Sequence, residues 1–567
     1  MPIVGIDLGT TNSLVSYWKD NQCIMIPNAL GSNLTPSVVS VDDQEEIIVG
    51  QIAKERLITH PDRTVQAFKR YMGSSKEIEL GKYKFLPEEL SSFVIRSLIQ
   101  DAEAYFGEKI TEAVISVPAY FNDAQRKATK RAGELAGLKV ERLINEPTAA
   151  ATAYGLHQQE SETKFLVFDL GGGTFDVSIV EIFENVLEVQ SIAGDNYLGG
   201  EDFTKLLVDT FMEKYQLDPL TIDQKIYATI KKQAEVCKKS LGDIKRGSIS
   251  CMKEDQELRW DLDHKEFELI ARPLLLRLRH PIEKALKDAG LKARDLDEII
   301  LVGGATRMPI VHTLVSKMFG RFPACSVNPD EVVAAGAGIQ AAMKERSVLL
   351  KEVVLTDVCP YTLGIEVVVS NSLGKYESGH FSPIIERNTV IPVSRVETYS
   401  TVSDNQEMIR VKIFQGEGRL TINNIKLGEL EVDVPRALAG EQSINVRFTY
   451  DINSILEVEV EVVATGEKKS MIIEGSPGTM SKEEIKLRLE ALSHIKIHPR
   501  DRQENKLLLA RAERLYEESL RDARALIDRM ISDFEAILAK QDEKEIKKFA
   551  RKFKEELDAI EGDVDLF

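Results

Sequence analysis

Residues 169–176 carry side chains that could hold a phosphate: two aspartates, a threonine and three successive glycines. Apolar runs at 165–168 and 177–180 flank them, which predicts a hairpin of strand, glycine turn and strand. Glycines let backbone N–H groups approach an anion, and an aspartate beside those groups tolerates phosphate only with a cation such as Mg²⁺ between them. Taken alone, the stretch fits an ordinary glycine-rich hairpin equally well.

A second stretch repeats this outline near the amino terminus. A buried-strand pattern at residues 3–6 leads into the Asp-Leu-Gly-Thr-Thr-Asn turn at residues 7–12, and residues 14–18 have the pattern of the next strand. Two similar phosphate-type hairpins in one chain favour a duplicated pair of domains that closes on one ligand. A chance resemblance of both hairpins to a phosphate site is less probable than a chance resemblance of either one alone.

Segments between the two hairpins could complete such a site. We expect a strand at 113–117 that Pro118 ends, and a helix at 123–137 that a glycine ends. Glu146 lies directly before a proline, and it contributes only if its turn faces the phosphates; otherwise it is a solvated turn carboxylate. The alanine run at 149–153 predicts a tightly packed helix.

A third glycine turn follows the strand pattern of residues 299–302. It contains Gly303, Gly304 and Arg307, and a helix follows, an order suited to holding a ring or a phosphate at the start of a helix. Three glycine turns after buried strands indicate one nucleotide cleft. The chain lacks a Gly-x-x-x-x-Gly-Lys-[Ser/Thr] loop, which excludes a P-loop enzyme.

Composition narrows the class of protein. The 567 residues suggest three or four domains, and a net charge of -18 argues against nucleic acid or an anionic membrane as the main partner. The five cysteines are far apart and form no Cys-x-x-Cys pair, which indicates a reducing compartment and no zinc site. No signal peptide and no apolar run of about 18 residues is present, so we expect a soluble cytoplasmic protein.

The carboxy-terminal part has a different pattern. Residues 351–357 are a short apolar stretch between charges, either an edge strand or a linker that docks and undocks. Beyond residue 478, charged amphipathic helices must cover a sandwich or a partner. Between them, short alternating segments predict the strands of a β-sandwich, at 363–369, 389–392, 409–414, 430–434, 444–449, 455–463 and 469–473.

Along nearly the whole chain these motifs resemble the DnaK-type heat-shock 70-kDa chaperones. The motifs that carry the resemblance lie at residues 5–13, 117–123, 145–150, 169–176 and 303–309. The resemblance implies an α/β chain with a duplicated actin-like, ribonuclease-H-like ATPase domain, followed by a β-sandwich and an α-helical lid. The short helical end and the divergent sandwich resemble the specialised bacterial HscC type more than the housekeeping member.

From this resemblance we expect four parts in the chain. They are a nucleotide-binding ATPase domain at 1–346, an interdomain linker at 347–357, a β-sandwich that binds substrate at 358–478 and the lid at 479–567. Residues 353–356 of the linker are less apolar than the leucine-rich linker of the family, which predicts weaker coupling between the domains.

The resemblance also implies how ATP is bound and hydrolysed. Lys69, Glu146, Asp169 and Thr174 match the family's catalytic residues, and Asp176 orders the same loop. Asp7 and Asp169 match the carboxylates of the Mg²⁺ site, which act through metal-bound water, and K⁺ beside them is compatible with the family. The residues implied to bind ATP or ADP are Asp7, Gly9, Thr10, Thr11, Asn12, Lys69, Gly171, Gly172, Gly173, Thr174, Gly199, Gly200, Glu235, Lys238, Gly303, Gly304 and Arg307.

One position departs from the family pattern. Glu235, Lys238 and Arg307 match adenosine contacts, and the Arg307 guanidinium can stack on the base. Gly242 stands where the family usually has a serine hydroxyl, so nucleoside affinity and exchange rate carry over less directly.

Three further sets of residues match the family's coupling and partner sites. Among the residues matched to the bound peptide, Tyr399 and Val402 stand where family members often have Phe and Ala. Periodicity alone would make Ile365 and Ile409 of the same set ordinary core residues. The sets are Pro118, Arg126 and Glu146 for the relay from the γ-phosphate; Arg142, Asn145 and Asp357 for a J-domain partner; and Ile365, Val368, Tyr399, Val402 and Ile409 for the bound peptide.

The implied function is that of an ATP-dependent chaperone in protein folding and stress response. It would bind and release extended hydrophobic segments of unfolded clients, coupled to Mg²⁺-dependent hydrolysis of ATP to ADP and phosphate. A J-domain protein is the implied partner, and the need for a nucleotide exchange factor stays open. A sugar kinase or a filament-forming protein of the same actin-like fold are the alternatives, but neither explains a sandwich and a helical lid.

Overall fold

The structure is a computed structural model of the whole chain. It describes residues 2–20, 22–155, 163–183, 186–243, 246–253, 256–324, 328–344, 354–370, 376–451, 455–473, 499–519 and 521–564. Two compact units are present. Unit 1 contains Met1–Tyr361 and Arg387–Ile391, and unit 2 contains Thr362–Glu386 and Pro392–Phe567.

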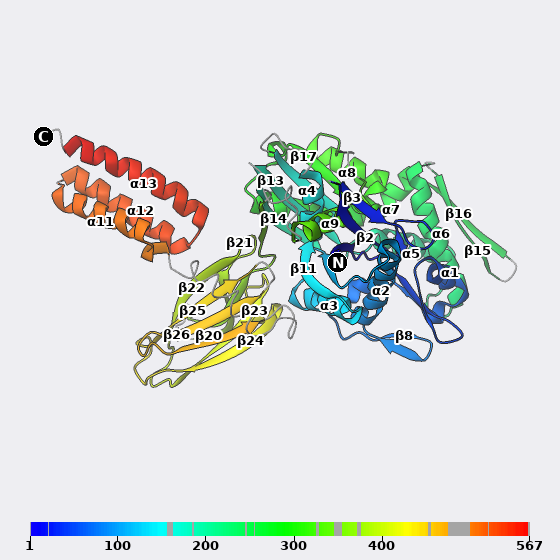
Figure 1. Cartoon of the computed structure of the whole chain (residues 1–567), viewed down its shortest axis with the longest axis horizontal. Coiled ribbons are helices and arrows are strands. Elements are labelled where there is room, and N and C mark those ends of the chain that lie inside the picture. Colours follow the sequence, from blue (N-terminus) through cyan, green and yellow to red (C-terminus); the bar gives the residue numbers. More distant parts are fainter. Residues whose placement is uncertain are drawn as a thin grey trace. The chain divides into compact units, whose positions relative to one another are not determined.

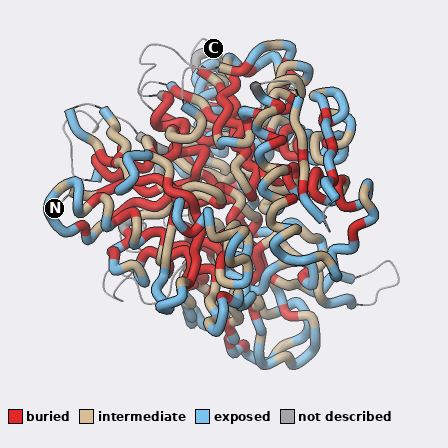
Figure 2. The backbone as a smooth tube through the Cα atoms, turned by 90° about the vertical axis from the view of Figure 1, so that its right-hand side faces the viewer, coloured by how far each residue is buried: buried red, intermediate tan, exposed pale blue. Residues whose placement is uncertain are grey.

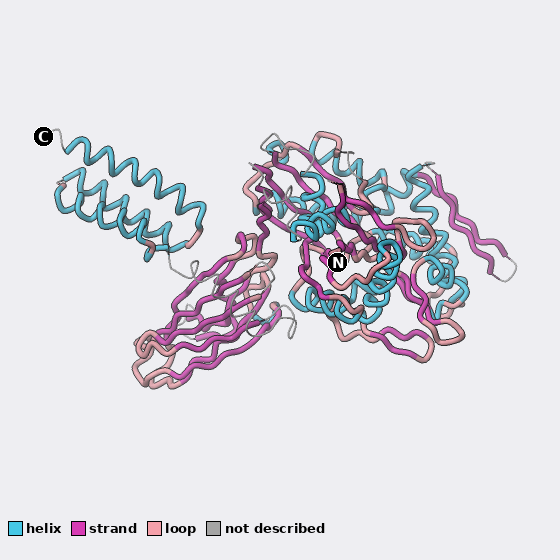
Figure 3. The backbone as a smooth tube through the Cα atoms, in the orientation of Figure 1, coloured by secondary structure: helices cyan, strands magenta, loops and turns pink. Residues whose placement is uncertain are grey.

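The first large sheet of unit 1 contains the amino-terminal hairpin (Figures 1 and 3). Strands β1 (Val4–Asp7), β2 (Asn12–Lys19) and β3 (Gln22–Ile26) are successive and antiparallel. Strand β10 (Glu112–Val117) lies parallel to β1, and β11 (Lys139–Asn145) lies parallel to β10. The predicted strands at 3–6, 14–18 and 113–117 are confirmed.

The second large sheet repeats this order of strands. Strands β12 (Thr163–Leu170), β13 (Phe175–Phe183) and β14 (Val186–Asp195) are again successive and antiparallel, and β17 (Glu298–Val302) lies parallel to β12. Asp169 and Asp176 face each other across the β12–β13 ladder. The sequence therefore predicted both hairpins correctly, and the repeated topology is that of a duplicated domain pair.

Helix α9 (Val332–Lys344) packs at backbone distance against the first sheet and against α4 (Glu146–Gly155). A Cβ on Gly5 would overlap the backbone of Gly338, and one on Gly336 would overlap the carbonyl of Ala149. The small residues of both helices are what permit this approach. The alanine run is therefore tightly packed, as predicted.

The other helices of unit 1 pack against the two sheets, and buried side chains of helices and strands share hydrophobic clusters. Figure 2 colours the buried residues red. Within the described residues, no helix combines the length and the apolar character needed to cross a bilayer. The remaining long helices are α1 (Gln51–Thr59), α2 (Pro87–Phe106), α3 (Asp123–Leu135), α5 (Gly200–Lys214), α6 (Gln224–Asp243), α7 (His264–Asp288) and α8 (Pro309–Phe319).

The end of the predicted linker forms strand β18 (Val354–Val358) at the edge of the second sheet. It pairs in parallel with β14, and β21 (Val390–Ile391) pairs with β18. Residues 389–392 were expected in the sandwich, so this expectation was wrong for the part that forms β21. An Arg387–Asp288 ion pair of 2.9 Å helps to keep this segment in unit 1. Residues 345–353 lie outside the described residues.

Unit 2 contains a sandwich of two four-stranded sheets, ordered β20-β19-β23-β24 and β22-β25-β26-β27. Strands β20 and β22 were missed in the sequence because Gly379 and Pro383 interrupt the alternation of β20, and β22 contains mostly polar and charged residues. The strands are β19 (Leu363–Ser370), β20 (Tyr376–Ile385), β22 (Val393–Ser400), β23 (Met408–Gln415), β24 (Ile425–Asp433), β25 (Ser443–Tyr450), β26 (Leu456–Val462) and β27 (Lys468–Ile473).

Three carboxy-terminal helices, α11 (Gln503–Glu518), α12 (Arg521–Lys540) and α13 (Glu543–Val564), share a core of their own. Phe534 and Phe553 are buried in it, with ring centroids 4.7 Å apart. The apolar faces that were expected to cover the sandwich or a partner are thus buried against one another. The predicted start of the lid, at residues 479–498, lies outside the described residues.

Replacing Gly336 with alanine should destabilise unit 1, because the added methyl group overlaps the Ala149 carbonyl. We expect the free energy of unfolding to fall by about 1–3 kcal/mol. Urea denaturation followed by tryptophan fluorescence measures it, since both tryptophans, Trp18 and Trp260, lie in unit 1.

The matched control is Gly242→Ala. Gly242 is in helix α6, and a Cβ there would meet nothing closer than 3.9 Å, so alanine should leave stability unchanged or raise it. Equal unfolding midpoints for the Gly336→Ala variant and the unmodified chain would contradict the close packing of α9.

Candidate functional site

The tips of the two glycine hairpins touch in unit 1. A Cβ on Gly172 would overlap the Thr11 hydroxyl, and one on Gly173 would lie 2.8 Å from Thr10 Cγ2. Only glycine allows the tips to meet this closely. The two stretches that the sequence singles out for phosphate are therefore side by side.

The start of helix α5 fixes the orientation of the second turn. The amides of Gly200 and Glu201 donate to the carbonyls of Gly171 and Gly172, at 2.9 and 2.8 Å. Because the C=O and N–H of a trans peptide point in opposite directions, the N–H groups of Gly172 and Gly173 point away from α5. This is the orientation that an anion-binding turn requires.

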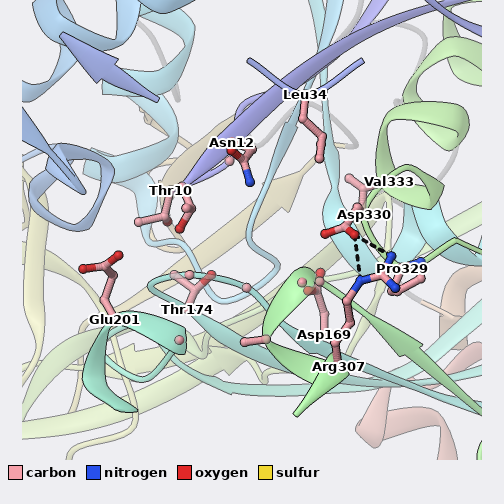
Figure 4. A pocket seen from close by; sticks show the side chains of 18 of the residues that line it. Thr10, Asn12, Leu34, Asp169, Thr174, Glu201, Arg307, Pro329, Asp330 and Val333 are labelled. Atoms are coloured by element: carbon pink, nitrogen blue, oxygen red, sulfur yellow. Dashed lines mark hydrogen bonds and ion pairs between the residues drawn. The ribbon is translucent and has the colours of Figure 1, made fainter. Parts of the chain in front are cut away.

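A cavity of about 450 Å³ borders both tips, which is the size of a small-molecule site (Figure 4). Two predicted ATP residues, Gly173 and Gly199, are behind its wall, where a Cβ on Gly199 would lie 2.5 Å from the Gly172–Gly173 peptide. The predicted residues that line the cavity are Asp7, Gly9, Thr10, Thr11, Asn12, Lys69, Glu146, Asp169, Gly171, Gly172, Thr174, Gly200, Glu235, Lys238, Gly303, Gly304 and Arg307.

Several lining residues were missed in the sequence. Leu34 and Val333 are apolar residues with no motif around them, and only the fold brings them to the cavity (Figure 4). Asp330 had a usable signal, since it follows Asn328 and Pro329 directly before helix α9. Its carboxylate pairs with the Arg307 guanidinium at 2.6 Å, and Arg307 also donates to Asn328 at 3.0 Å.

Lys69 faces a group of carboxyls in the part of the cavity that borders the hairpin tips. Lys69 Nζ lies 2.8 Å from Glu146 Oε1, and Lys69 is only 3% exposed. Asp169 and Asp176 are buried beside them, and Asp7 ends strand β1 at the same place. The turn of Glu146 thus faces the phosphate-type tips, which was the condition that the sequence left open.

Burial raises the pKa values of the three aspartates, and the charge of the nearby Glu146 raises them further. The pKa of Asp7 and that of Asp176 are each raised to about 7, and the pKa of Asp169 is raised well above its usual value. Lys69 lowers all three in part. The site therefore holds more negative charge than one lysine neutralises, and it favours an additional cation.

The donor set suits Mg²⁺ bound together with phosphate. Asp169 Oδ2 is buried and has no hydrogen-bond partner, and Asp7 Oδ1 is oriented by the Ser116 hydroxyl at 2.7 Å. Mg²⁺ is commonly held by one or two carboxylates plus substrate phosphates and water. Among the described residues, no group of three or more His, Cys, Asp and Glu side chains is placed to hold a metal ion.

An ion pair that the sequence did not reveal lies over the second turn. Arg70 donates to both carboxylate oxygens of Asp202 at 3.0 Å, and Asp202 also accepts from the Gly199 amide at 2.8 Å. Arg70 follows Lys69, and its Cγ lies against Gly173. The pair joins the segment that carries Lys69 to the start of α5.

Glu235 also lines the cavity, where it is held by its own helix and by α5. It pairs with Lys238 at 2.6 Å and accepts from Thr204 at 2.5 Å. Burial alone raises the Glu235 pKa, but Lys238, Thr204 and Lys239 outweigh it and lower the pKa to about 2. Glu235 is thus ionised at neutral pH and able to accept hydroxyl hydrogen bonds.

Residues from the relay set and the J-domain set form one hydrogen-bonded chain within unit 1. Arg126 donates to the Ala119 carbonyl at 3.1 Å and to Asn145 Oδ1 at 2.6 Å, and Asn145 donates to Asp357 at 2.7 Å. Arg142 instead donates to Gln340, at 3.0 Å. Strand β18 is therefore tied to the segment directly before Glu146.

The predicted peptide residues come from both sheets of the sandwich. Ile365 is buried in β19, whereas Val368 on the same strand is exposed. Ile409 in β23, Tyr399 in β22 and Val402 just beyond it are partly buried. Ile365 is thus a core residue, as its periodicity suggested, and the other four have surface that a ligand could cover.

Comparison with known proteins identifies the family. The family described as Hsp70 protein matches residues 3–565. The chain is 44% identical over 502 residues to the chaperone protein DnaK of Thermotoga petrophila and to that of Thermotoga maritima, which covers 86% of this chain and 83% of each relative. It is 43% identical over 486 residues to DnaK of Thermosipho melanesiensis, with 83% and 80% covered. The chain belongs to the Hsp70 family and is an ATP-dependent chaperone with ATPase activity.

Below about pH 7, ADP and Mg²⁺ should bind more weakly, and their binding should release protons. The Asp7 pKa is about 7, so at lower pH a proton must leave before a cation binds. We expect affinity to fall up to about tenfold per pH unit below that value. Calorimetry in buffers of different ionisation enthalpy, at about pH 6 and about pH 8, measures both quantities.

The direction of the pH effect can also be checked on the folding stability of the ligand-free chain. A carboxyl whose pKa is raised on folding binds more protons in the folded state, so its contribution to stability is lost as pH rises from about 4 to 7. Asp7→Asn should bind the cation more weakly and lose the share of this pH dependence that Asp7 contributes, while Asp169 and Asp176 retain theirs. An affinity that does not change between the two pH values would contradict the raised pKa.

Proposed function

We propose that unit 1 binds ATP in the 450 Å³ cavity and that its hydrolysis controls the binding of extended hydrophobic segments by the sandwich of unit 2. The observation that carries the proposal is the cluster of buried carboxyls around Lys69, next to two touching glycine turns. Such an arrangement suits a polyphosphate with its cation. The family supplies the second half of the proposal, the polypeptide client.

In this proposal the chemistry is positioning and charge neutralisation. Lys69 contacts the γ-phosphate, Glu146 and Thr174 orient the attacking water, and the glycine amides hold the phosphates. Asp7 and Asp169 would hold Mg²⁺ through its water, and the ion supplies charge for the phosphate oxygens when bound. K⁺ beside the phosphates is compatible with the same surplus of negative charge.

Glu235 and Lys238 would contact the ribose, and Arg307 would stack on the base. The geometry supports this assignment, because Asp330 and Asn328 hold the guanidinium in place at the cavity wall. Gly242 offers no side chain to the base. We therefore keep the nucleotide residues of the sequence analysis, and add Asp330 as the group that orients Arg307.

Coupling would run through β18 and the chain of Asp357, Asn145 and Arg126. This chain reaches the residue before Glu146, which pairs with Lys69 at the phosphate end. Two states, with β18 paired to β14 or released, would be biased in opposite directions by nucleotide and peptide. Pro118 is part of this proposal through its place between β10 and the Ala119 carbonyl.

For clients, we propose Val368, Tyr399, Val402 and Ile409 as direct contacts, with Ile365 beneath them. Extended segments would add to a sheet edge and fill an apolar pocket. A J-domain partner would meet Arg142 first, because Asn145 is only 4% exposed and its amide is bonded to Asp357. The domain boundaries, the cytoplasmic location and the HscC-type character stay predictions, and no exchange factor is assigned.

A sugar kinase or a filament protein is the competing class. Both would use a similar nucleotide site, but neither accounts for the sandwich and the helices beyond it. The relatives, which are named as chaperones across the whole region compared, favour the chaperone.

Thr174→Ala should still bind ATP but lose most turnover, by about 100-fold, because the hydroxyl that orients water is removed while the glycine amides remain. Single-turnover hydrolysis and the affinity for a fluorescent ATP analogue separate the two effects. Thr229→Ala is the control, since that hydroxyl bonds to the Lys225 carbonyl on α6 and is not part of the cavity wall. Near-normal hydrolysis by Thr174→Ala would contradict the assignment.

ATP should release a fluorescent hydrophobic peptide from the full chain. Because the Thr174→Ala variant retains ATP binding, it should release the peptide as well, and ADP should not. Fluorescence anisotropy measures the release rate. A kinase or a filament protein would show no peptide binding, and a peptide that stays bound after ATP is added would argue against coupling.

A further inference from the structure

Tyr361, the last residue of unit 1 before the sandwich, is bonded to the loop that follows β10. Its hydroxyl donates to the Tyr120 carbonyl at 2.6 Å, and the two ring centroids are 4.7 Å apart. Burial raises the Tyr361 pKa, so the hydroxyl stays protonated. Neither the ATP site nor the peptide site described above uses this residue.

The other side of Tyr120 is bonded to the phosphate end of the cavity. Its backbone amide donates to Asp176 Oδ1 at 3.0 Å, and Asp176 is 1% exposed and opposite Asp169 in the β12–β13 ladder. A single residue, Tyr120, thus joins Tyr361 to the carboxyl next to Asp169. The path contains two hydrogen bonds and no flexible side chain between them.

Tyr120 is held from other directions as well. Asn196 donates to the same carbonyl at 2.8 Å, and Lys284 Nζ lies 3.2 Å from the Tyr120 hydroxyl. Loss of the Tyr361 hydroxyl therefore leaves the carbonyl bonded to Asn196, and the loop intact. Of these groups, Tyr361 is the one next to unit 2, because Thr362 is the first residue of that unit.

We propose that Tyr361 is a positioning residue for ATP hydrolysis: through the Tyr120 backbone, its hydroxyl sets the position of the Asp176 carboxyl, and it transmits movement of the sandwich junction to that carboxyl. The inference rests on the proposed function and assigns a coupling route to it. The chain of Asp357, Asn145 and Arg126 reaches the same loop, because Arg126 donates to the Ala119 and Phe121 carbonyls on either side of Tyr120. The two routes therefore converge on the loop whose amide holds Asp176.

The test is Tyr361→Phe in the full chain, which keeps the ring and removes the hydroxyl. The measured quantity is the ratio of the ATP hydrolysis rate with saturating hydrophobic peptide to the rate without it. We expect this ratio to fall about fivefold, the effect of one net hydrogen bond. Affinity for fluorescent ADP should not change, which shows that the site is folded.

Tyr215→Phe is the matched control, because the Tyr215 hydroxyl also donates to a backbone carbonyl in unit 1, that of Arg259. Its ratio should equal that of the unmodified chain. Tyr361→Leu removes the ring and the hydroxyl together, and its stimulation ratio should fall by the same factor as that of Tyr361→Phe. If Phe keeps the ratio and only Leu loses it, ring packing is responsible and the assignment to the hydroxyl is overturned.

Failure of this inference differs from failure of the proposed function. An unmodified chain that peptide stimulates, together with Tyr361→Phe stimulated equally, overturns the role of Tyr361 and leaves the chaperone function in place. An unmodified chain that peptide does not stimulate contradicts the proposed coupling, and the inference with it.

Discussion

Buried negative charge is the constraint on which the structure of unit 1 depends. Strand ends from both sheets bring Asp7, Asp169 and Asp176 to one place, where Glu146 adds a fourth carboxyl and Lys69 supplies an ammonium. Removing these groups from water costs free energy unless cations or protons compensate, and burial accordingly raises the pKa values of the three aspartates. A site built in this way is poorly satisfied alone and well satisfied with Mg²⁺ and a polyphosphate.

Close backbone packing keeps that charge in place. Helix α9 meets β1 and α4 at Gly5 and Gly336, where an added Cβ would overlap backbone. A Cβ on Gly338 would overlap the Ser16 and Cys23 side chains. The ends of β1 and α4 carry Asp7 and Glu146, so the packing of small residues fixes the distance between these two carboxyls. Rigid positioning of this kind is what phosphoryl transfer to water needs, because the protein contributes no covalent step.

Sequence patterns could locate the hairpins and the glycine turns, because strand alternation and glycine runs are local signals. The role of Glu146 could be stated only as a condition, since its contact with Lys69 joins residues 77 apart in the chain. Leu34, Arg70 and Tyr361 gave no local signal at all, because each acts through a partner that only the fold supplies. Strand β21 was misplaced for the same reason: a two-residue strand has no period, and its partner β18 is distant in the sequence.

The pairing of β18 with β14 has a consequence for the protein's own solubility. Without β18, β14 is the edge of the second sheet, and its backbone groups at Val186–Glu188 lose their partners. An uncovered edge strand is a template for pairing with another chain. The segment that links the two units therefore also protects a sheet edge, and a molecule in which it is released is more prone to self-association than one in which it is paired.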